Sequence, residues 1–401
     1  MGRTIEPPKP IGGVQIVATP EDFSPSRSDM KVVGAFNPGV TRITEGSEEK
    51  MFLLVRKAEA FVEPEPDDPA MRIVRAPHFP VTNCRDSPFR IEADNYPISE
   101  ISGRTHKEIR FKNRTPDRLL HISYPAVCVL DQNGKIERIE DPAGLRPVWE
   151  HERFGTEDLR CTRRDPGEEI ELGGERFEYV ITYVLPHRTH GVSTGVALTN
   201  NFKEFVRVSP SPNETPRAMF EGKDIVFFPR RIHKEGIDGQ MRPMEAALTR
   251  PSSFPNISRP DICLSFGTDV TSVGSFPYRL VESKGDNISG PGPAPLELKD
   301  EGIWLTFYHQ VQILAGKPIY RTAMLGLNLE RPWEVVYKSK PFIQPNEHAR
   351  GKSFVADVNY VTGAEFRDKG RLVETLFGEN DECTTRRVYE TARLVKFLKQ
   401  G

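Results

Sequence analysis

The sequence predicts an all-β protein, and three observations carry that prediction. Short runs of β-branched and aromatic residues recur between turns rich in Gly, Pro, Asn and Asp. The 401 residues include 35 prolines and 31 glycines, which leave little room for long helices. One unit also recurs, an apolar strand, a polar turn and a second apolar strand that ends in Asp or Asn. Many short strands indicate a sandwich, a barrel or a propeller, and the recurring unit favours radial repetition.

The predicted strands follow one another along most of the chain. They cover residues 51–55, 126–130, 179–184, 191–198, 225–228, 303–308, 320–329 and 372–378. The sequence Gln132-Asn133-Gly134-Lys135 separates two apolar runs. It predicts a hairpin, because Asn-Gly readily takes the positive φ values of a tight turn.

The two ends of the chain differ from the rest. Residues 384–399 predict one short C-terminal helix, since Val388, Leu394, Val395 and Leu398 lie on roughly one stripe. Residues 1–30 are rich in Pro, Ser and charge and predict an extended N-terminal arm. No low-complexity linker interrupts the remainder, so residues 31–401 are predicted to form one domain.

Composition narrows the functional classes. The formal net charge is -2, from 55 basic and 57 acidic residues, which argues against a nucleic-acid binder that works through a positive field. The sequence has no 18-residue apolar run and no N-terminal basic-then-apolar signal, so no membrane partner is expected. The five cysteines are scattered without a CxxC pair, which indicates neither a zinc site nor a disulfide framework. We therefore expect a cytoplasmic protein without a metal.

A charge cluster stands out at Gly155-Thr156-Glu157-Asp158-Leu159-Arg160. Adjacent carboxylates beside a fixed cation suit a site that moves protons and holds hydroxyl groups. A surface cluster of this composition is more often a solvated salt link, so the segment alone leaves both interpretations open.

Six ordered groups of segments carry a family resemblance that runs from about Phe36 to the C-terminus. They are Phe36-Asn37-Pro38-Gly39-Val40 with residues 52–56, Glu157-Asp158-Leu159-Arg160, residues 223–229 with Thr249-Arg250-Pro251, Gly290-Pro291-Gly292-Pro293-Ala294-Pro295-Leu296, residues 304–311, and Phe377-Gly378-Glu379-Asn380-Asp381. In this order and spacing they resemble glycoside hydrolase family 130, the mannoside phosphorylases and related β-mannosidases. The resemblance implies a five-bladed β-propeller with the active site in its central cavity. Leu159 departs from the family pattern, where proline is usual.

The resemblance implies that Asp158 is the catalytic acid. Cleavage of a glycosidic bond needs a proton on the leaving oxygen and a nucleophile at the anomeric carbon. The family's acid lies in this motif and is thought to act through a sugar hydroxyl, with Glu157 and Arg160 orienting it. Sugar-binding roles fall to Asn37, Arg56, Arg160, Asp224 and Asp381. The alternative is that Asp158 only pairs with Arg160.

An external phosphate can replace a second catalytic carboxylate, and it then needs cations and hydroxyl groups. The resemblance assigns this phosphate subsite to Lys223, Arg250, His309 and Tyr320. Tyr320 follows His309 by eleven residues, a spacing that suits a hairpin partner. The alternatives are a core histidine, a packed strand tyrosine and a surface arginine.

Several positions depart from the family pattern. Asp224 follows Lys223 where many relatives carry asparagine, and an aspartate beside phosphate is repulsive unless it binds sugar hydroxyls or activates water. Asn287-Ile288-Ser289 replaces a common Lys-Ile pair, with Lys284 slightly earlier. Asp357 stands where Asn is usual, and the charged loop of residues 230–244 is expected to rim the cavity.

These features predict an inverting phosphorylase that cleaves a β-mannoside and releases α-mannose 1-phosphate, with phosphate as co-substrate and no other cofactor. The alternative is an inverting β-mannosidase that uses water, which the Lys223-Asp224 pair favours. A third hypothesis is a non-catalytic sugar-binding propeller. The predicted partners are a β-mannoside oligosaccharide, phosphate and, through the N-terminal arm, a second copy of the chain.

Overall fold

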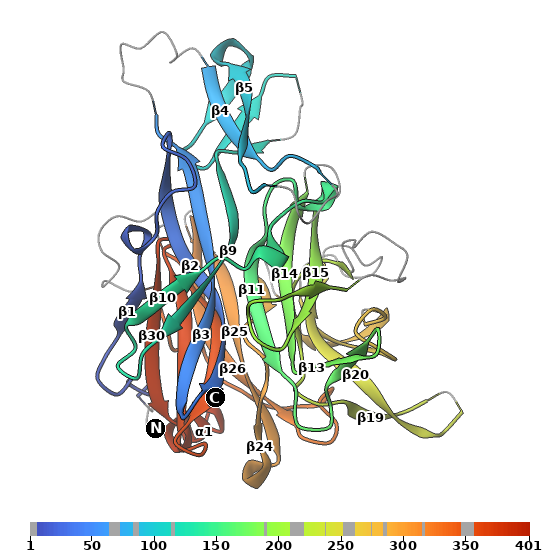
Figure 1. Ribbon diagram of the computed structural model, residues 1–401. Helices are drawn as coiled ribbons and strands as arrows, with labels where there is room; N and C mark the ends of the chain where they lie inside the picture. The colour runs from blue at the N-terminus through green and yellow to red at the C-terminus, as the bar shows by residue number, and fades with distance from the viewer. Residues whose placement is uncertain are drawn as a thin grey trace.

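The computed structural model describes residues 6–63, 73–82, 88–113, 117–187, 191–208, 220–236, 238–251, 261–273, 275–283, 287–314, 317–345 and 357–401. Strands dominate these residues, which confirms the all-β prediction (Figure 1). Among these residues the single α-helix is α1 (Thr391–Leu398). No helix of the described residues is long and apolar enough to cross a bilayer. Short 3-10 turns cover Pro20–Asp22, Ile98–Glu100, Ala143–Leu145, Glu150–Glu152 and Lys299–Glu301.

Five antiparallel sheets of four or five strands follow one another through the described ranges. The first sheet orders β10 (Ile136–Glu140), β9 (His121–Leu130), β3 (Glu48–Phe61) and β2 (Met30–Glu45). The second orders β11 (Glu157–Arg163), β14 (Tyr179–His187), β15 (Gly191–Thr199) and β16 (Val206–Arg207), with β17 (Phe220–Glu221) on β15. The third orders β18 (Lys223–Phe227), β20 (Met241–Arg250), β21 (Ile262–Gly267) and β22 (Ser275–Val281), with β19 (Ile232–Glu235) on β20.

The last two sheets follow the same plan. The fourth orders β23 (Ile288–Pro291), β25 (Ile303–Leu314), β26 (Lys317–Asn328) and β27 (Val335–Lys338), with β24 (Leu296–Leu298) on β25. The fifth orders β28 (Asn359–Arg367), β29 (Leu372–Glu379), β30 (Cys383–Glu390) and β1 (Gln15–Ala18). If β1 is set aside, each sheet has its first strand in chain order at one edge. These edge strands are β2, β11, β18, β23 and β28.

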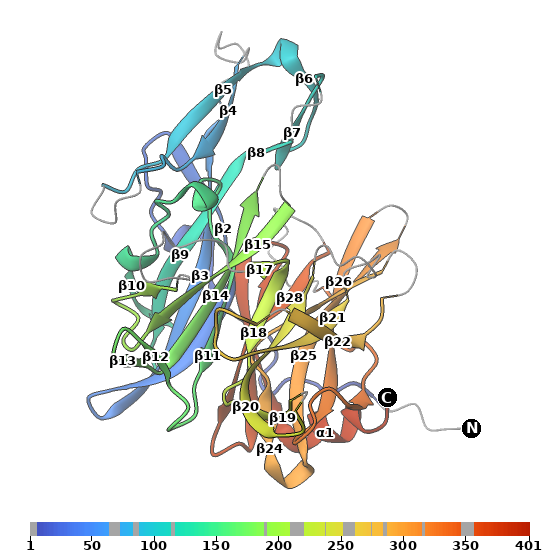
Figure 2. The ribbon, with the colours of Figure 1, turned by 90° about the vertical axis from the view of Figure 1, so that its right-hand side faces the viewer.

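Apolar clusters join each sheet to the next and the fifth to the first. Leu54 of the first sheet packs with Ile181 of the second, in a cluster that also contains Leu159. Three further clusters join the second to the third sheet, the third to the fourth and the fourth to the fifth. The cycle returns to the first sheet where Leu53 packs with Leu376 of the fifth. The edge strands also contact one another, β2 with β11 and β28, and β11 with β18 (Figure 2).

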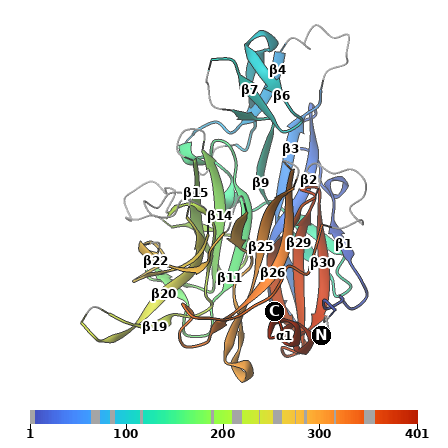
Figure 3. The same ribbon diagram turned by 180° about the vertical axis from the view of Figure 1, so that it is seen from behind.

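The two chain ends meet in the fifth sheet (Figure 3). Strand β1, inside the predicted arm of residues 1–30, pairs with β30 in the register Gln15 to Arg386. The predicted helix of residues 384–399 is wrong in its first half, because Cys383–Glu390 is strand β30. This segment pairs with β29 on one side and β1 on the other. Its β-branched residues suit that central position, and the helix begins only at Thr391.

Two insertions extend from the sheets. Between β3 and β9 the chain forms a pair, β4 (Ile73–His78) with β5 (Glu92–Pro97), and a small sheet of β6 (Ile101–Arg104), β7 (Glu108–Phe111) and β8 (Arg118–Leu119). These strands stand beyond one end of β2 and β3 (Figure 1). A further small pair is β12 (Ile170–Leu172) with β13 (Glu175–Phe177).

The loop predicted to rim the cavity, residues 230–244, forms a hairpin through β19 and the start of β20 instead. Ile232 pairs with Met244 there, whereas Arg250 at the other end of β20 pairs with Lys223. Met241 and Arg250 are the two ends of this strand, and a strand of that length spans about 30 Å. The hairpin therefore lies away from Arg250, because it continues the opposite end of the strand.

Candidate active site

Three side chains at the centre of the site stand on left-handed backbone. The φ angles are 49° at Asn37, 47° at Asp158 and 63° at Asp224. Each residue lies at a register shift near the start or middle of an edge strand, in β2, β11 and β18 respectively. Asn and Asp tolerate this conformation better than other residues with a Cβ, because their short side chains form local hydrogen bonds. The same kind of irregularity therefore recurs in three sheets, and all three side chains are buried.

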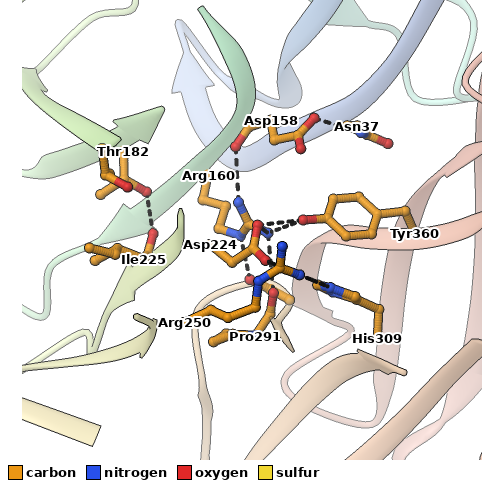
Figure 4. A network of polar contacts seen from close by, with 12 residues as sticks. Asn37, Asp158, Arg160, Thr182, Asp224, Ile225, Arg250, Pro291, His309 and Tyr360 are labelled. Carbon is orange, nitrogen blue, oxygen red and sulfur yellow. Dashed lines mark hydrogen bonds and ion pairs between the residues drawn. The ribbon is translucent and has the colours of Figure 1, made fainter. Parts of the chain in front are cut away.

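Asp158 lies in a hydrogen-bonded cluster at the upper side of Figure 4. Its Oδ1 accepts hydrogen bonds from Asn37 Nδ2 at 2.7 Å and from Arg56 Nη1 at 2.8 Å. Arg56 also donates to Glu157 Oε1 at 2.6 Å and to Ser123 Oγ at 3.0 Å. Burial opposes ionisation of Asp158, but Arg56, Lys223 and the Asn37 hydrogen bond outweigh it and lower its pKa. These contacts therefore favour the ionised carboxylate.

Two neighbouring carboxyl groups behave in the opposite way. Burial raises the pKa of Glu157, and the Arg56 charge only partly opposes it. Burial also raises the pKa of Asp381, against the attraction of Arg56 and Lys107. Groups with pKa values pushed apart within one buried cluster are typical of sites that transfer protons.

Arg160 occupies the middle of the site and is 1% exposed. All of its guanidinium nitrogens donate to protein oxygens, which are Gly292 O at 2.9 Å, Pro291 O at 3.1 Å, Asp158 O at 3.0 Å, Asp224 Oδ1 at 3.1 Å and Tyr360 Oη at 2.8 Å. Arg160 therefore holds the backbone of Asp158 and the carboxylate of Asp224 in fixed positions. This engagement leaves it as a positioning group rather than a direct sugar ligand.

Asp224, Arg250 and His309 form the lower part of the network in Figure 4. Arg250 Nη1 lies 3.0 Å from Asp224 Oδ2 and 3.1 Å from His309 Nε2. Since an arginine only donates, Nε2 accepts and the imidazole proton resides on Nδ1. Burial lowers the pKa of His309 well below its usual value, and Arg160 and Lys223 lower it further, so the ring is neutral. A Cβ on residue 290 would lie 2.6 Å from Asp224 Oδ2, so this approach requires Gly290.

Lys223 and Tyr320 complete this group. Lys223 pairs in register with Arg250, and within the described ranges its ammonium forms no ion pair. Burial lowers its pKa, but Asp224 and Asp158 more than compensate, so the pKa is raised and the cation is retained. The Tyr320 ring centroid lies 6.0 Å from that of His309. Its predicted hairpin is confirmed, because Val311 in β25 pairs with Tyr320 in β26.

The structure thus brings the predicted charged residues into one region, in which Asp158, Asp224 and His309 are buried and Lys223 and Arg250 are partly buried. Asp357 is exposed, and its carbonyl accepts the Tyr320 backbone N–H at 3.0 Å. Lys284 lies outside the described residues. In the described part of the chain, no group of three or more His, Cys, Asp and Glu side chains has a metal-binding arrangement.

Sequence reasoning missed Tyr360 and Ser123. Tyr360 Oη donates to Asp224 Oδ1 at 2.6 Å, and its ring centroid lies 4.4 Å from that of His309. Both residues sit inside strand-like runs without a motif of their own, so the sequence carries no signal that separates them from ordinary strand residues.

The arrangement offers an ionisable acid, Asp158, next to a group of cations, Arg250 and Lys223, and a neutral imidazole.

No family model matches the chain. The chain is 26% identical over 354 residues to a β-1,2-mannobiose phosphorylase of Listeria innocua, and the match covers 86% of each protein. The motifs named above occur in order along the five sheets of the fold. The chain is thus similar in sequence to a mannoside phosphorylase, in agreement with the resemblance to glycoside hydrolase family 130.

Solved structures are similar to this chain at the level of the fold. The structure of the β-1,2-mannobiose phosphorylase from Listeria innocua with β-1,2-mannobiose has a TM-score of 0.75 and 22% identity, and covers 96% of this chain and 97% of its own. A second structure comes from work on the GH130 family of mannoside phosphorylases, which contains glycoside hydrolases that target β-1,2 mannosidic linkages in Candida mannan. It has a TM-score of 0.59 and 12% identity over 98% of this chain and 96% of that one. Family 130 thus includes relatives of both reaction types.

Proposed function

We propose that this protein is an inverting phosphorylase that cleaves a β-linked mannoside and releases α-mannose 1-phosphate. The observation that carries the proposal is the group formed by Arg250, His309 and Lys223 beside Asp158. Arg250 presents a planar fork, and Lys223 presents an ammonium that has no ion-pair partner among the described residues. Together these two groups suit a phosphate oxyanion. The relative that is a β-1,2-mannobiose phosphorylase makes β-1,2-linked mannobiose the first substrate to test.

In the proposed reaction a phosphate oxygen attacks the anomeric carbon from the face opposite the leaving group. The new bond to phosphate forms as the glycosidic bond breaks, which inverts the configuration. The leaving oxygen takes a proton that originates on Asp158, directly or through a sugar hydroxyl. Inorganic phosphate is the co-substrate, and we propose no other cofactor.

The lowered pKa of Asp158 fits an ordered reaction. Lys223 is one of the cations that lower the Asp158 pKa. A phosphate bound to Lys223 cancels part of that charge, and the pKa of Asp158 then rises toward the protonated form that a proton donor needs. Phosphate binding is therefore expected to prepare the acid.

The five sheets support a related proposal, that the fold is a five-bladed β-propeller. The sheets pack in a cycle, and residues of their edge strands form the candidate site. The cytoplasmic location and the role of residues 1–30 in a homo-oligomer stay predictions.

Hydrolysis is the second candidate, and Asp224 is the observation that favours it. Its carboxylate lies within the proposed anion subsite and could take a proton from water. A panel of β-linked mannosides, incubated with and without phosphate, separates the two reactions when mannose and mannose 1-phosphate are measured independently. Phosphorolysis predicts mannose 1-phosphate that requires phosphate. Mannose release that is unaffected by phosphate would refute the proposal.

A further inference from the structure

The carboxylate of Asp224 lies among the groups assigned to phosphate and is itself fully buried, at 0% exposure. Four elements pack charged or ionisable groups against it. Arg160 and Tyr360 donate to Oδ1, while Arg250 and His309 face Oδ2 at 3.0 and 3.7 Å. A negative group at this place needs a physical reason, because it repels an anion.

The two carboxylate oxygens differ in their partners. Oδ1 accepts two hydrogen bonds, from Arg160 at 3.1 Å and Tyr360 at 2.6 Å. Oδ2 is buried but accepts no well-directed hydrogen bond from the described residues, although Arg250 lies nearby. The same Arg250 nitrogen hydrogen-bonds to His309 Nε2. A buried acceptor without a donor is costly, so Oδ2 is suited to a hydrogen-bond donor supplied by a ligand.

Hydrogen phosphate brings such a donor, whereas most inorganic oxyanions do not. At neutral pH phosphate keeps at least one P–OH group, but sulfate has lost all its protons. An ionised carboxylate only accepts hydrogen bonds, so it can pair with a P–OH and not with a bare oxyanion oxygen. Lys223 and Arg250 remain as cations for the unprotonated oxygens.

We propose that Asp224 makes the anion subsite specific for a protonated oxyanion, because Oδ2 accepts a hydrogen bond from the P–OH of hydrogen phosphate. This inference rests on the proposed function and deepens it, since it names the form of the co-substrate that the site accepts. Asp224 is then a specificity-determining residue. It admits phosphate and arsenate and rejects sulfate.

The first test needs no substitution. Calorimetry on the full chain at neutral pH measures the affinities for phosphate, arsenate, sulfate and monofluorophosphate. Monofluorophosphate has nearly the size and double charge of hydrogen phosphate but carries fluorine in place of the P–OH. We expect phosphate and arsenate to bind at least about tenfold more tightly than sulfate and monofluorophosphate, the difference that one unmatched buried acceptor produces.

The second test uses Asp224→Asn. Arg160 and Tyr360 keep the amide oxygen in the place of Oδ1, so the amide nitrogen replaces Oδ2 and donates to a bare oxygen. We expect sulfate and monofluorophosphate to gain about tenfold in affinity and the selectivity to fall to within about threefold. Asp261→Asn is the matched control. Asp261 is also buried and ion-paired, with Arg279, but it lies just before β21 and has no contact with Asp224 among those described.

The outcomes separate this inference from the proposed function. Equal affinity of the unmodified protein for phosphate and monofluorophosphate would overturn the role of Asp224 and leave phosphorolysis standing. Selectivity that survives in Asp224→Asn would also overturn it. Failure of the unmodified protein to bind phosphate at all would remove both the inference and the phosphate subsite.

Discussion

Arg160 shows how one residue joins the two halves of the candidate site. Its guanidinium binds the backbone carbonyl of Asp158 and the carboxylate of Asp224. Breaking a buried ion pair by removal of one partner costs about 3–5 kcal/mol, because the other charge is left uncompensated. Arg160 thus ties the geometry of the acid to that of the anion subsite, and each of its three guanidinium nitrogens donates to a protein oxygen.

Asp158→Asn tests the acid directly. The amide oxygen can still accept the hydrogen bonds of Asn37 and Arg56, so the fold is expected to persist. The variant lacks a transferable carboxyl proton, and we expect the turnover number to fall by about 10²–10⁴-fold. Steady-state kinetics measures this loss, with thermal unfolding as the control for folding. Turnover close to that of the unmodified protein would remove Asp158 from the role of acid.

The sequence predicted most of the charged members of the site together with Asn37 and Tyr320, but it missed Tyr360, Ser123 and Lys107. Asp158, Arg250 and His309 stand in segments whose residue types already suggest proton transfer or anion binding. Tyr360 contacts Asp224 in β18 and Arg160 in β11 because the fold brings β28 next to those strands. Nothing in the sequence around Tyr360 indicates these neighbours. The contacts of Arg160 fit the orienting role expected of it, but the partners themselves come from segments far apart in the chain.

At the scale of elements, the inserted strands β4–β8 bring Lys107 toward the sugar-binding residues. Its carbonyl accepts the Leu120 N–H at 2.6 Å, which fixes the turn before β7. Burial lowers the pKa of Lys107, while Asp381 raises it and Arg56 lowers it, so these charges are neighbours. The insertion therefore reaches the site from the side where β2 and β3 project (Figure 1).

Lys107→Met tests whether this insertion contacts the sugar. The substitution keeps much of the side-chain length and removes the ammonium. We expect KM for the mannoside to rise about tenfold with a small change in the turnover number, since a hydrogen bond from a charged group is lost. Lys112→Met is the matched control, because Lys112 directly follows β7 and its side chain is exposed. Equal kinetics in the two variants would place Lys107 outside the substrate contacts.

A second element-scale prediction concerns Glu365 in β28. Burial raises its pKa to about 7, against the attraction of Arg42 in β2 and Arg163 in β11. Because the folded pKa exceeds the unfolded value of 4.5, its contribution to stability is complete below that value. The contribution is lost as pH rises through about 7.

Glu365→Gln should remove this pH dependence. We expect the variant to be about as stable as the unmodified protein at acidic pH and more stable by roughly 2 kcal/mol above neutral pH. Denaturant unfolding at both pH values measures the difference. The exposed Glu175 provides the control Glu175→Gln, which is expected to change stability little at either pH. A gain that is equal at both pH values would contradict the assigned pKa.

The error in the predicted helix also belongs to this scale. The stripe of apolar residues in 384–399 satisfied a helical period, but Val388 belongs to β30 and only the later residues to α1. Pairing with β29 and β1 overrides the local pattern, and such pairing depends on strands far away in the chain.

For the whole molecule, the chain ends are structurally joined. Strand β1 adds to a sheet whose other strands come from the last 43 residues, 359–401. Val17 is buried in the cluster that links this sheet to the first one, whereas the adjacent Ile16 is 45% exposed. The sequence indicated that strands dominate the chain, but the partner of residues 15–18 followed only from the cyclic packing.

Val17→Ala tests this junction. The loss of two buried methyl groups is expected to lower the free energy of unfolding by about 2 kcal/mol. Ile16→Ala, on the opposite face of the same strand, should change it by less than about 0.5 kcal/mol. Denaturant unfolding of both variants measures the contrast. Equal effects would show that β1 contributes little to joining the two sheets.

The left-handed backbone at Asn37, Asp158 and Asp224 has a consequence for how this site can diversify. Only residues such as aspartate, asparagine and glycine occupy that conformation at low cost, so few substitutions are tolerated there. Aspartate and asparagine are nearly identical in shape, yet one carries a charge and the other a donor. A single-residue exchange can thus alter the charge of the site without disturbing its scaffold. In a lineage of such proteins, the choice of ligand can drift while the architecture stays constant.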